Sequence, residues 1–135
     1  MNGPSETQIQ RTILDGLLYK GIMAWRNNVA AVPIRRGKAI VGFRRADLHV
    51  VGMPDILSIV SCPCCAVGVL VGIEVKSHGK KQKPEQKHWQ EKMENNGAFY
   101  ILAHSFDEAL DGIESIKKKM SEMQKNLCHK AEPLR

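Results

Sequence analysis

Residues 52–76 read GMPDILSIVSCPCCAVGVLVGIEVK. Two apolar runs, Ile56–Val60 and Val67–Val71, lie on either side of a turn rich in Cys, Pro and Ser. Short apolar runs bounded by turn residues are typical of paired strands. The segment therefore predicts a β-hairpin that carries one acid, Asp55, on its first strand and an acid and a lysine, Glu74 and Lys76, on its second.

The two-residue period of a strand determines which of these side chains meet. Successive side chains point to opposite faces, so Glu74 and Lys76 share one face of the second strand. The other face is apolar throughout and consists of Val67, Val69, Val71, Ile73 and Val75. Burial of that apolar face holds Glu74 and Lys76 together on the opposite side. If the hairpin pairs in the matching register, Asp55 lies beside Glu74.

This set of side chains points to metal-dependent chemistry. Two neighbouring carboxylates repel each other, so one of them titrates abnormally unless a cation lies between them. Mg²⁺ prefers oxygen ligands and keeps several of its waters. Lys76 could then orient or deprotonate a water, or stabilise charge on a phosphate. Two acids and a lysine at one site therefore indicate metal-assisted hydrolysis of phosphodiesters.

The arrangement resembles the motif of the PD-(D/E)XK nuclease superfamily, present here as Pro54-Asp55 followed by Glu74-Val75-Lys76. Its surroundings resemble the VRR-NUC branch, because a lysine-rich link, Gln86 leading a helix and Gly97 before a strand follow the motif. The resemblance covers residues 5–104. It implies an α/β fold with a restriction-endonuclease-like core, in which helices flank a central mixed β-sheet in the order α-β-β-β-α-β-α.

The resemblance also implies roles for particular residues of a Mg²⁺-dependent DNA endonuclease, with Mn²⁺ as a substitute for Mg²⁺. Asp55 and Glu74 are expected to bind the metal, with Glu6 and the Val75 carbonyl as further ligands. Lys76 is expected to act on the attacking water or on the phosphate. Gln86 is expected near the catalytic site without being a metal ligand. For Glu6 the residues alone allow another interpretation, since an acid in the first turn of a helix is favoured by the helix dipole.

Small members of this branch are similar to enzymes that cut branched DNA, including four-way (Holliday) junctions. A homodimer is expected with this substrate, because symmetric cutting of a junction needs two sites and one chain supplies one. Flap cutting or nonspecific nicking by the same fold is an alternative. A non-catalytic DNA-binding module is another, although the presence of Asp55, Glu74 and Lys76 argues against it. In a third alternative, DNA has no role and the hairpin acids are surface charges.

Composition sets the limits for these hypotheses. The chain has 135 residues, 43% of them hydrophobic, which fits one domain with one core and argues against extensive disorder. Its formal net charge of +6 favours an acidic partner such as nucleic acid. No apolar run approaches the length of a membrane span, so no membrane partner is expected. The polar residues 1–10 lack the apolar core of a signal peptide, and we expect a cytoplasmic protein of the producing or host cell.

Basic residues outside the motif form two groups that are candidates for DNA contact. The first accompanies strands expected at Val29–Ile34 and Ala39–Phe43 and comprises Arg35, Arg36, Lys38, Arg44 and Arg45. A solvated sheet edge that discourages aggregation is the alternative for this group. The second follows the hairpin and comprises Lys80, Lys81 and Lys83, either a strap over the DNA or a solvated loop. Arg26, in an expected strand at residues 22–27, is a further candidate by the resemblance alone, which implies that Arg26 or Asn27 lines the cleft.

Three helices are expected. A capping box of Ser5 and Gln8 opens the first, and Pro84 opens the second. The last follows Ser105 and carries an apolar stripe that ends in Met120 and Met123, a pair that could pack on another subunit. We expect a single domain over residues 1–125 and a flexible tail over residues 126–135.

The turn of the hairpin contains Cys62, Cys64 and Cys65. Three thiols in four residues suggest zinc, but the Cys-x-Cys-Cys pattern is not a usual zinc spacing and one loop rarely surrounds a tetrahedral ion. Structural zinc is therefore not expected here. Reduced thiols without disulfides are the favoured interpretation for a cytosolic protein.

Overall fold

The computed structural model describes residues 3–28, 31–45 and 50–130, and at residues 31, 45 and 128–130 it describes the backbone. The elements follow in the order α1 (Glu6–Tyr19), β1 (Met23–Arg26), β2 (Ala31–Arg36), β3 (Ala39–Arg45), β4 (Ile56–Ser61), β5 (Gly68–Val75), α2 (Pro84–Asn95), β6 (Phe99–Ala103) and α3 (Phe106–Lys130).

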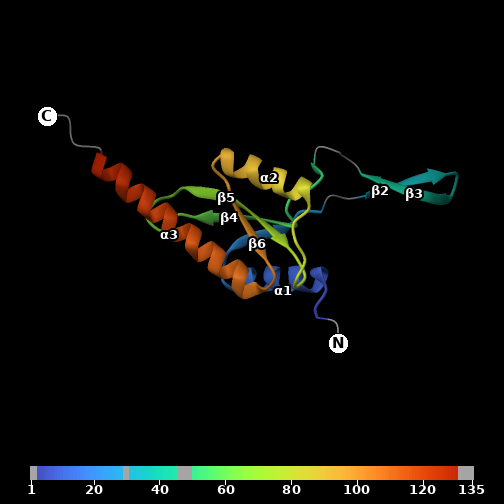
Figure 1. Cartoon of the computed structure of the whole chain (residues 1–135), viewed down its shortest axis with the longest axis horizontal. Helices are drawn as coiled ribbons and strands as arrows, with labels where there is room; N and C mark the ends of the chain where they lie inside the picture. The colour runs from blue at the N-terminus through green and yellow to red at the C-terminus, as the bar shows by residue number, and fades with distance from the viewer. Residues whose placement is uncertain (1–2, 29–30, 46–49, 131–135) are drawn as a thin grey trace.

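Four strands form the central sheet in the spatial order β1-β4-β5-β6 (Figure 1). β4 is antiparallel to both β1 and β5, whereas β6 is parallel to β5, so the sheet is mixed. Along the chain, the elements of this layer and its helices are α1, β1, β4, β5, α2, β6 and α3. This confirms the predicted α/β fold and the predicted order α-β-β-β-α-β-α.

β2 and β3 form a separate two-stranded sheet inserted between β1 and β4. The two strands pair antiparallel, with an irregularity between Ile34 and Arg35. Figure 1 shows this hairpin extending away from the central sheet. The expected strands at Val29–Ile34 and Ala39–Phe43 correspond to it, with β2 beginning at Ala31 and both strands ending two residues later.

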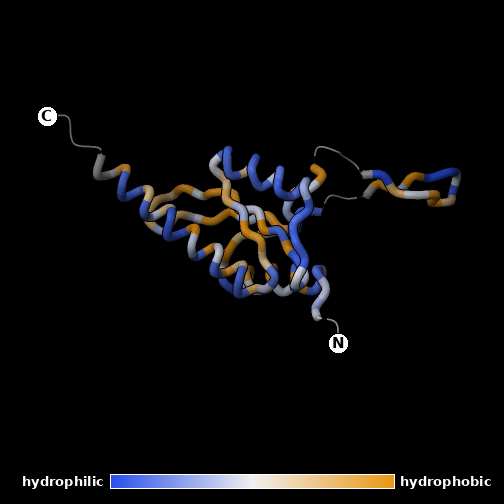
Figure 2. The backbone as a smooth tube through the Cα atoms, viewed as in Figure 1, coloured by the Kyte–Doolittle hydropathy of each residue, from blue (hydrophilic) through white to orange (hydrophobic). Residues whose placement is uncertain are grey.

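Helices cover both faces of the central sheet (Figure 1). On one face, α1 and α3 pack on the apolar side of β5, and the core there includes Ile13, Ile73 and Ile113, all fully buried. Figure 2 shows hydrophobic positions concentrated between these layers and hydrophilic ones along the outer sides of the helices. Burying this apolar surface is the main contribution to the stability of the fold.

α2 covers the opposite face of β5, and this differs from the simplest expectation for the hairpin. Residues 71–76 are buried on both faces of the sheet, including Glu74 and Lys76. A Cβ atom at Gly72 would lie 2.6 Å from Pro54 Cγ and 2.9 Å from Met93 Cε, so a glycine is required where α2 approaches the strand. The acids therefore lie between the sheet and a helix layer and not on an open face.

α3 continues beyond the boundary expected from sequence. The helix runs to Lys130, so residues 126–130 belong to it and not to a tail, while residues 131–135 lie outside the described residues. Its buried stripe ends at Met120, and Met123 is 61% exposed. No helix in the described part of the chain has both the length and the apolar character needed to cross a membrane.

The close approach of α2 to β5 gives a test of the fold. We expect Gly72→Ala to lower the free energy of unfolding by about 1–3 kcal/mol, because the added methyl group overpacks the contact with Pro54 and Met93. Urea unfolding followed by circular dichroism measures this change. The matched control is Gly42→Ala in β3, where nothing lies within 4 Å of the added Cβ and the effect should stay within about 1 kcal/mol. Equal stability of the two variants would contradict the described packing.

Candidate active site

The register of β4 and β5 places the first acid of the site. Ile56 pairs with Ile73 and Leu57 with Gly72, so the residue before β4, Asp55, stands opposite Glu74 as predicted. Asp55 Oδ2 accepts a hydrogen bond from the Val75 backbone N–H at 2.8 Å. A charge-assisted bond of this kind is stronger than a neutral one and fixes the orientation of the carboxylate.

The loop before β4 is held from the other side by Asn27. The Asn27 side chain donates to the Pro54 carbonyl at 3.1 Å, and its backbone N–H donates to the Asp55 carbonyl at 2.8 Å. At Gly52, φ is +85°, and a Cβ atom there would lie 2.6 Å from the Glu85 backbone. Glycine is therefore needed for both the turn and the close approach to α2 just ahead of the acid.

Glu74 and Lys76 form a buried ion pair at the end of β5. Only 1% of Glu74 and 6% of Lys76 is exposed, and Lys76 Nζ lies 2.9 Å from Glu74 Oε1. Gln86, in the first turn of α2, donates from Nε2 to the same Glu74 oxygen, and its own Oε1 accepts from the Lys83 backbone N–H at 2.8 Å. The structure thus brings Asp55, Glu74, Lys76 and Gln86 together from β4, β5 and α2.

Both acids have raised pKa values, because the effect of burial outweighs the positive charge near them. Burial raises the pKa of Glu74 to about 7, with the charge of Asp55 adding to the rise and the hydrogen bond from Lys76 opposing it. Burial also raises the pKa of Asp55, against the hydrogen bond from Val75 and the charge of Lys76. Such shifts occur where carboxylates share a site with too little compensating charge.

Glu74 also carries an unpaired oxygen, which tests whether the residues fit a metal ion. Its Oε2 is buried and has no hydrogen-bond partner among the described residues. A buried acceptor without a partner is costly, and a divalent cation would satisfy it. Oxygen donors on Glu74 and Asp55 are the ligands that Mg²⁺ prefers, so the pair fits such an ion.

Glu6 lies next to this pair without completing a tight cluster. Its Oε1 accepts from the Ser77 N–H at 3.4 Å and lies 3.8 Å from Lys80 Nζ. Its charge raises the pKa of both Asp55 and Glu74. Within the described ranges, the three acids do not form a group whose carboxylate oxygens all lie within 4.8 Å of one another. The structure therefore does not bring Glu6 as close to the other two acids as the resemblance implied for a shared ligand set.

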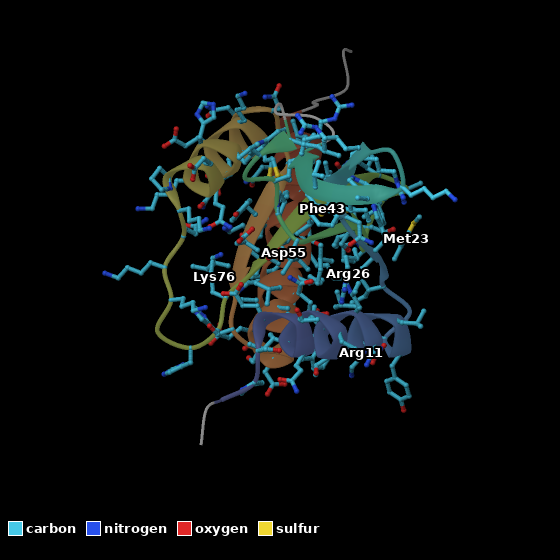
Figure 3. All side chains as sticks on the ribbon, turned by 90° about the vertical axis from the view of Figure 1, so that its right-hand side faces the viewer. Arg11, Met23, Arg26, Phe43, Asp55 and Lys76 are labelled. Carbon is cyan, nitrogen blue, oxygen red and sulfur yellow. The ribbon has the colours of Figure 1, made fainter. Side chains whose placement is uncertain are left out.

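The predicted DNA-binding residues occupy three places. Arg26 ends β1 and is half-buried, close enough for its charge to lower the pKa of Asp55, and Figure 3 draws Asp55 between Lys76 and Arg26. Exposed cations line the β2–β3 hairpin: Arg35, Arg36, Lys38 and Arg44. The Arg45 side chain lies outside the described residues. The remaining three, Lys80, Lys81 and Lys83, are exposed on the link between β5 and α2.

Two further residues belong to the site: Asn27, which the resemblance offered as lining the cleft, and Tyr100, which was not among the predicted residues. Asn27 positions the loop of Asp55, and Tyr100 on β6 has a buried hydroxyl whose pKa is raised by burial and by the charge of Glu74. Tyr100 pairs with Gly72 in β5, two residues from Glu74 and on the same face. Residues 98–103 have the pattern of an apolar buried strand, and this pattern does not single out Tyr100 as a neighbour of Glu74. The available signal was the parallel pairing of β5 and β6, which aligns Tyr100 with the face of Glu74.

Comparisons with known proteins bear on the fold. No protein-family model matches the chain, and no curated protein matches it. A solved structure described as a VRR_NUC domain is similar to this chain, with a TM-score of 0.51 and 19% sequence identity. The match covers 82% of this chain and 97% of the other. The chain therefore has the restriction-endonuclease-like fold of a VRR-NUC domain, as the motif predicted.

The raised pKa of Glu74 predicts a dependence of stability on pH. The folded pKa of about 7 lies above the ordinary glutamate value of 4.5, so the folded state binds more protons than the unfolded state between these values. The free energy of unfolding should therefore fall as pH rises through this window, with Glu74 contributing up to about 1.4 kcal/mol per pH unit. Glu74→Gln should remove this part of the slope. Thermal unfolding at a series of pH values in chelator measures it.

The control for this experiment is Glu114→Gln, which removes an exposed acid on α3 that makes an ion pair with Lys117. The slope of the free energy of unfolding against pH should be the same in Glu114→Gln as in the wild type. An unchanged slope in Glu74→Gln would show that the carboxylate is not desolvated in the folded protein.

Proposed function

We propose that this protein is a divalent-metal-dependent DNA endonuclease. The proposal rests above all on the convergence of Asp55, Glu74 and Lys76 at one place in a VRR-NUC fold. The buried Glu74 oxygen without a partner among the described residues supports it. Hydrolysis of a phosphodiester joins a water oxygen to phosphorus, breaks one P–O bond and passes a proton to the leaving alkoxide. The site contains groups suited to each part of this reaction.

Asp55 and Glu74 are the residues that would hold the ion, with Glu6 and the Val75 carbonyl as further ligands. A bound Mg²⁺ or Mn²⁺ supplies Lewis-acid polarisation of the phosphate and a lower pKa for a coordinated water. The ammonium group of Lys76 is a proton donor and lies 2.9 Å from Glu74 Oε1. At this position it can orient the attacking water or stabilise charge on the phosphate.

Gln86 acts as a positioning residue in this proposal. Its Nε2 holds Glu74 Oε1, while its Oε1 is held by the backbone of Lys83. The amide therefore fixes the rotation of the Glu74 carboxylate and leaves Oε2 as the oxygen that would be available to a metal ion. The same contact links the start of α2 to the lysine-rich segment that precedes it.

DNA is the substrate that the charge distribution favours. The net charge is +6, and cations lie on the hairpin and on the link beside the site. These groups can contact phosphates on two sides of the catalytic residues. Branched DNA such as a four-way junction is the proposed structure, cut by a homodimer in which each chain supplies one site. The exposed apolar end of α3, with Met123 and Leu127, is a candidate for the subunit contact.

A cleavage assay tests the catalytic proposal. Matched four-way junction, flap and linear duplex substrates are incubated with wild type or Lys76→Ala in Mg²⁺, Mn²⁺ or EDTA. We expect metal-dependent cutting by the wild type, strongest on the junction, and a loss of at least about 100-fold in Lys76→Ala. Lys117→Ala, a lysine on α3 remote from the site, should cut as the wild type does.

Other outcomes of this assay select the alternatives. Equal activity on flap or linear DNA favours a flap or nonspecific nickase. DNA binding without cleavage of any substrate favours a non-catalytic DNA-binding module. Absence of DNA binding would refute a role in DNA metabolism.

The hairpin provides a separate test of DNA contact. Arg35→Ala combined with Arg36→Ala, in the Lys76→Ala background, should weaken duplex binding and reduce the slope of log affinity against log salt by about two, one for each lost phosphate contact. Fluorescence anisotropy at several salt concentrations measures both quantities. The control pair Lys118→Ala and Lys125→Ala removes the same charge from exposed positions on α3. Equal effects of the two pairs would mean that only overall charge matters.

A further inference from the structure

The turn between β4 and β5 brings three thiols together. The sulfur atoms of Cys62, Cys64 and Cys65 all lie within 4.8 Å of one another, and the Cys62 and Cys64 sulfurs are 3.2 Å apart. Among the residues that the structure describes, these three are the potential metal-ligating side chains that lie within this distance of one another. The Cys62 N–H donates to the Val67 carbonyl at 2.8 Å, which closes the turn around them.

This geometry fits a thiophilic metal ion. A Zn–S bond of about 2.3 Å in a tetrahedron places neighbouring sulfurs about 3.8 Å apart, within the range spanned by the three thiols. Cys62 and Cys65 have the C-x₂-C spacing common in zinc sites, and Cys64 adds a third ligand from between them. The sequence argument against zinc was that the spacing is unusual and that one loop rarely surrounds the ion, whereas this loop folds so that three of its sulfurs converge.

The three thiols differ in their exposure to solvent. Cys62 is 6% exposed, whereas Cys64 is exposed to solvent. The protein therefore encloses the cluster on one side and leaves a side open through which an ion and a fourth, water ligand can enter.

We propose that Cys62, Cys64 and Cys65 bind one Zn²⁺ as thiolates, in a structural site separate from the catalytic acids. Binding releases three thiol protons to solvent and involves no change of oxidation state. The six residues of β4 at about 3.3 Å each separate this turn by about 20 Å from Asp55 at the other end of the hairpin. Zinc here would take no part in phosphodiester chemistry.

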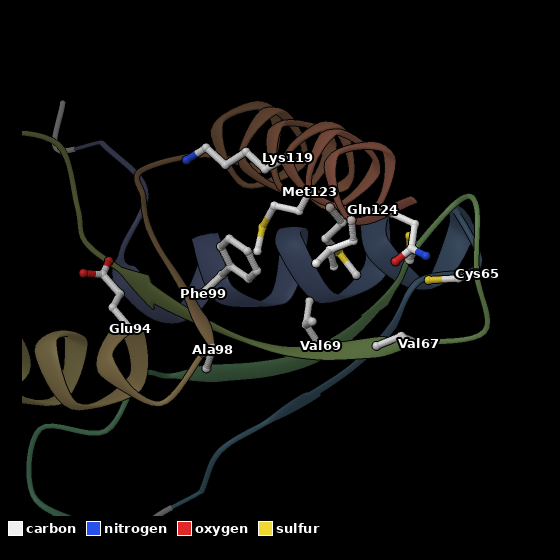
Figure 4. Close-up of a pocket in the computed structure, with 13 residues that line it drawn as sticks. Cys65, Val67, Val69, Glu94, Ala98, Phe99, Lys119, Met123 and Gln124 are labelled. Atoms are coloured by element: carbon white, nitrogen blue, oxygen red, sulfur yellow. The ribbon is translucent and has the colours of Figure 1, made fainter. Parts of the chain in front are cut away.

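The ion would fix the conformation of the turn at the far end of the hairpin, beside α3. Cys62 and Cys65 line a groove of about 540 Å³ together with Met120, Met123 and Gln124 of α3 (Figure 4). The turn is thus the place where β4, β5 and the distal half of α3 meet. Fixing it supports the β4–β5 register, on which the position of Asp55 depends.

Metal content tests this proposal directly. The reduced full-length protein receives one equivalent of ZnCl₂, is desalted, and is analysed by mass spectrometry of the elements. We expect about one zinc per chain in the wild type and in the control Ser61→Ala, which alters the strand residue next to the turn without removing a sulfur. Cys64→Ser and Cys65→Ser, at positions outside the fully buried core, should retain less than about a tenth of that amount. Asp55→Asn should retain zinc fully, because its carboxylate belongs to the other site.

Two further readouts do not depend on nuclease activity. Co²⁺ in place of zinc should give thiolate charge-transfer absorption in the near ultraviolet and the visible bands of a tetrahedral ion, both lost in Cys65→Ser. EDTA should lower the Tm of zinc-loaded wild type and leave that of Cys64→Ser unchanged. Absence of retained zinc in the reduced wild type, or equal retention by the cysteine variants, would overturn the proposal. Formation of a disulfide in place of zinc binding would overturn it as well.

Discussion

The hydrogen bond from the Val75 N–H to the Asp55 carboxylate is the contact on which the site depends. It exists because β4 and β5 pair with Ile56 opposite Ile73, and a shift of one residue would turn every side chain of the strand to the other face. The apolar residues of β5 that pack on α1 and α3 oppose such a shift. Core packing and placement of the candidate catalytic acids are therefore consequences of one register.

Burial gives the site its chemical character. Placing Glu74 and Lys76 in the centre of the sheet removes water that would otherwise stabilise their charges, and the ion pair between them compensates only in part. The remaining deficit of positive charge near Glu74 and Asp55 is what a divalent cation would correct. A fold that loses stability through these acids at neutral pH should gain it back when the ion binds.

The chain separates a packed core from exposed extensions. The central sheet and its helices hold the acids, whereas most of the predicted DNA-contacting cations lie on the β2–β3 hairpin and the β5–α2 link. Two strands alone bury little apolar surface, and Phe43 on the hairpin is 67% exposed. The hairpin therefore presents its cations to solvent without the support of a core of its own.

The resemblance to the VRR-NUC branch implied the order of the core elements. Local patterns in the sequence were sufficient to predict the β4–β5 hairpin, the shared face of Glu74 and Lys76, and the helices that begin near Ser5 and Pro84. Each follows from a period of two or 3.6 residues or from a cap within four residues, so neighbours along the chain carry the information. Burial of Glu74, its contact with Gln86, the proximity of Tyr100 and the convergence of three thiols depend on how α2, β6 and the turn dock. Those contacts join segments distant in sequence or require a particular loop conformation, and residue spacing alone does not specify them.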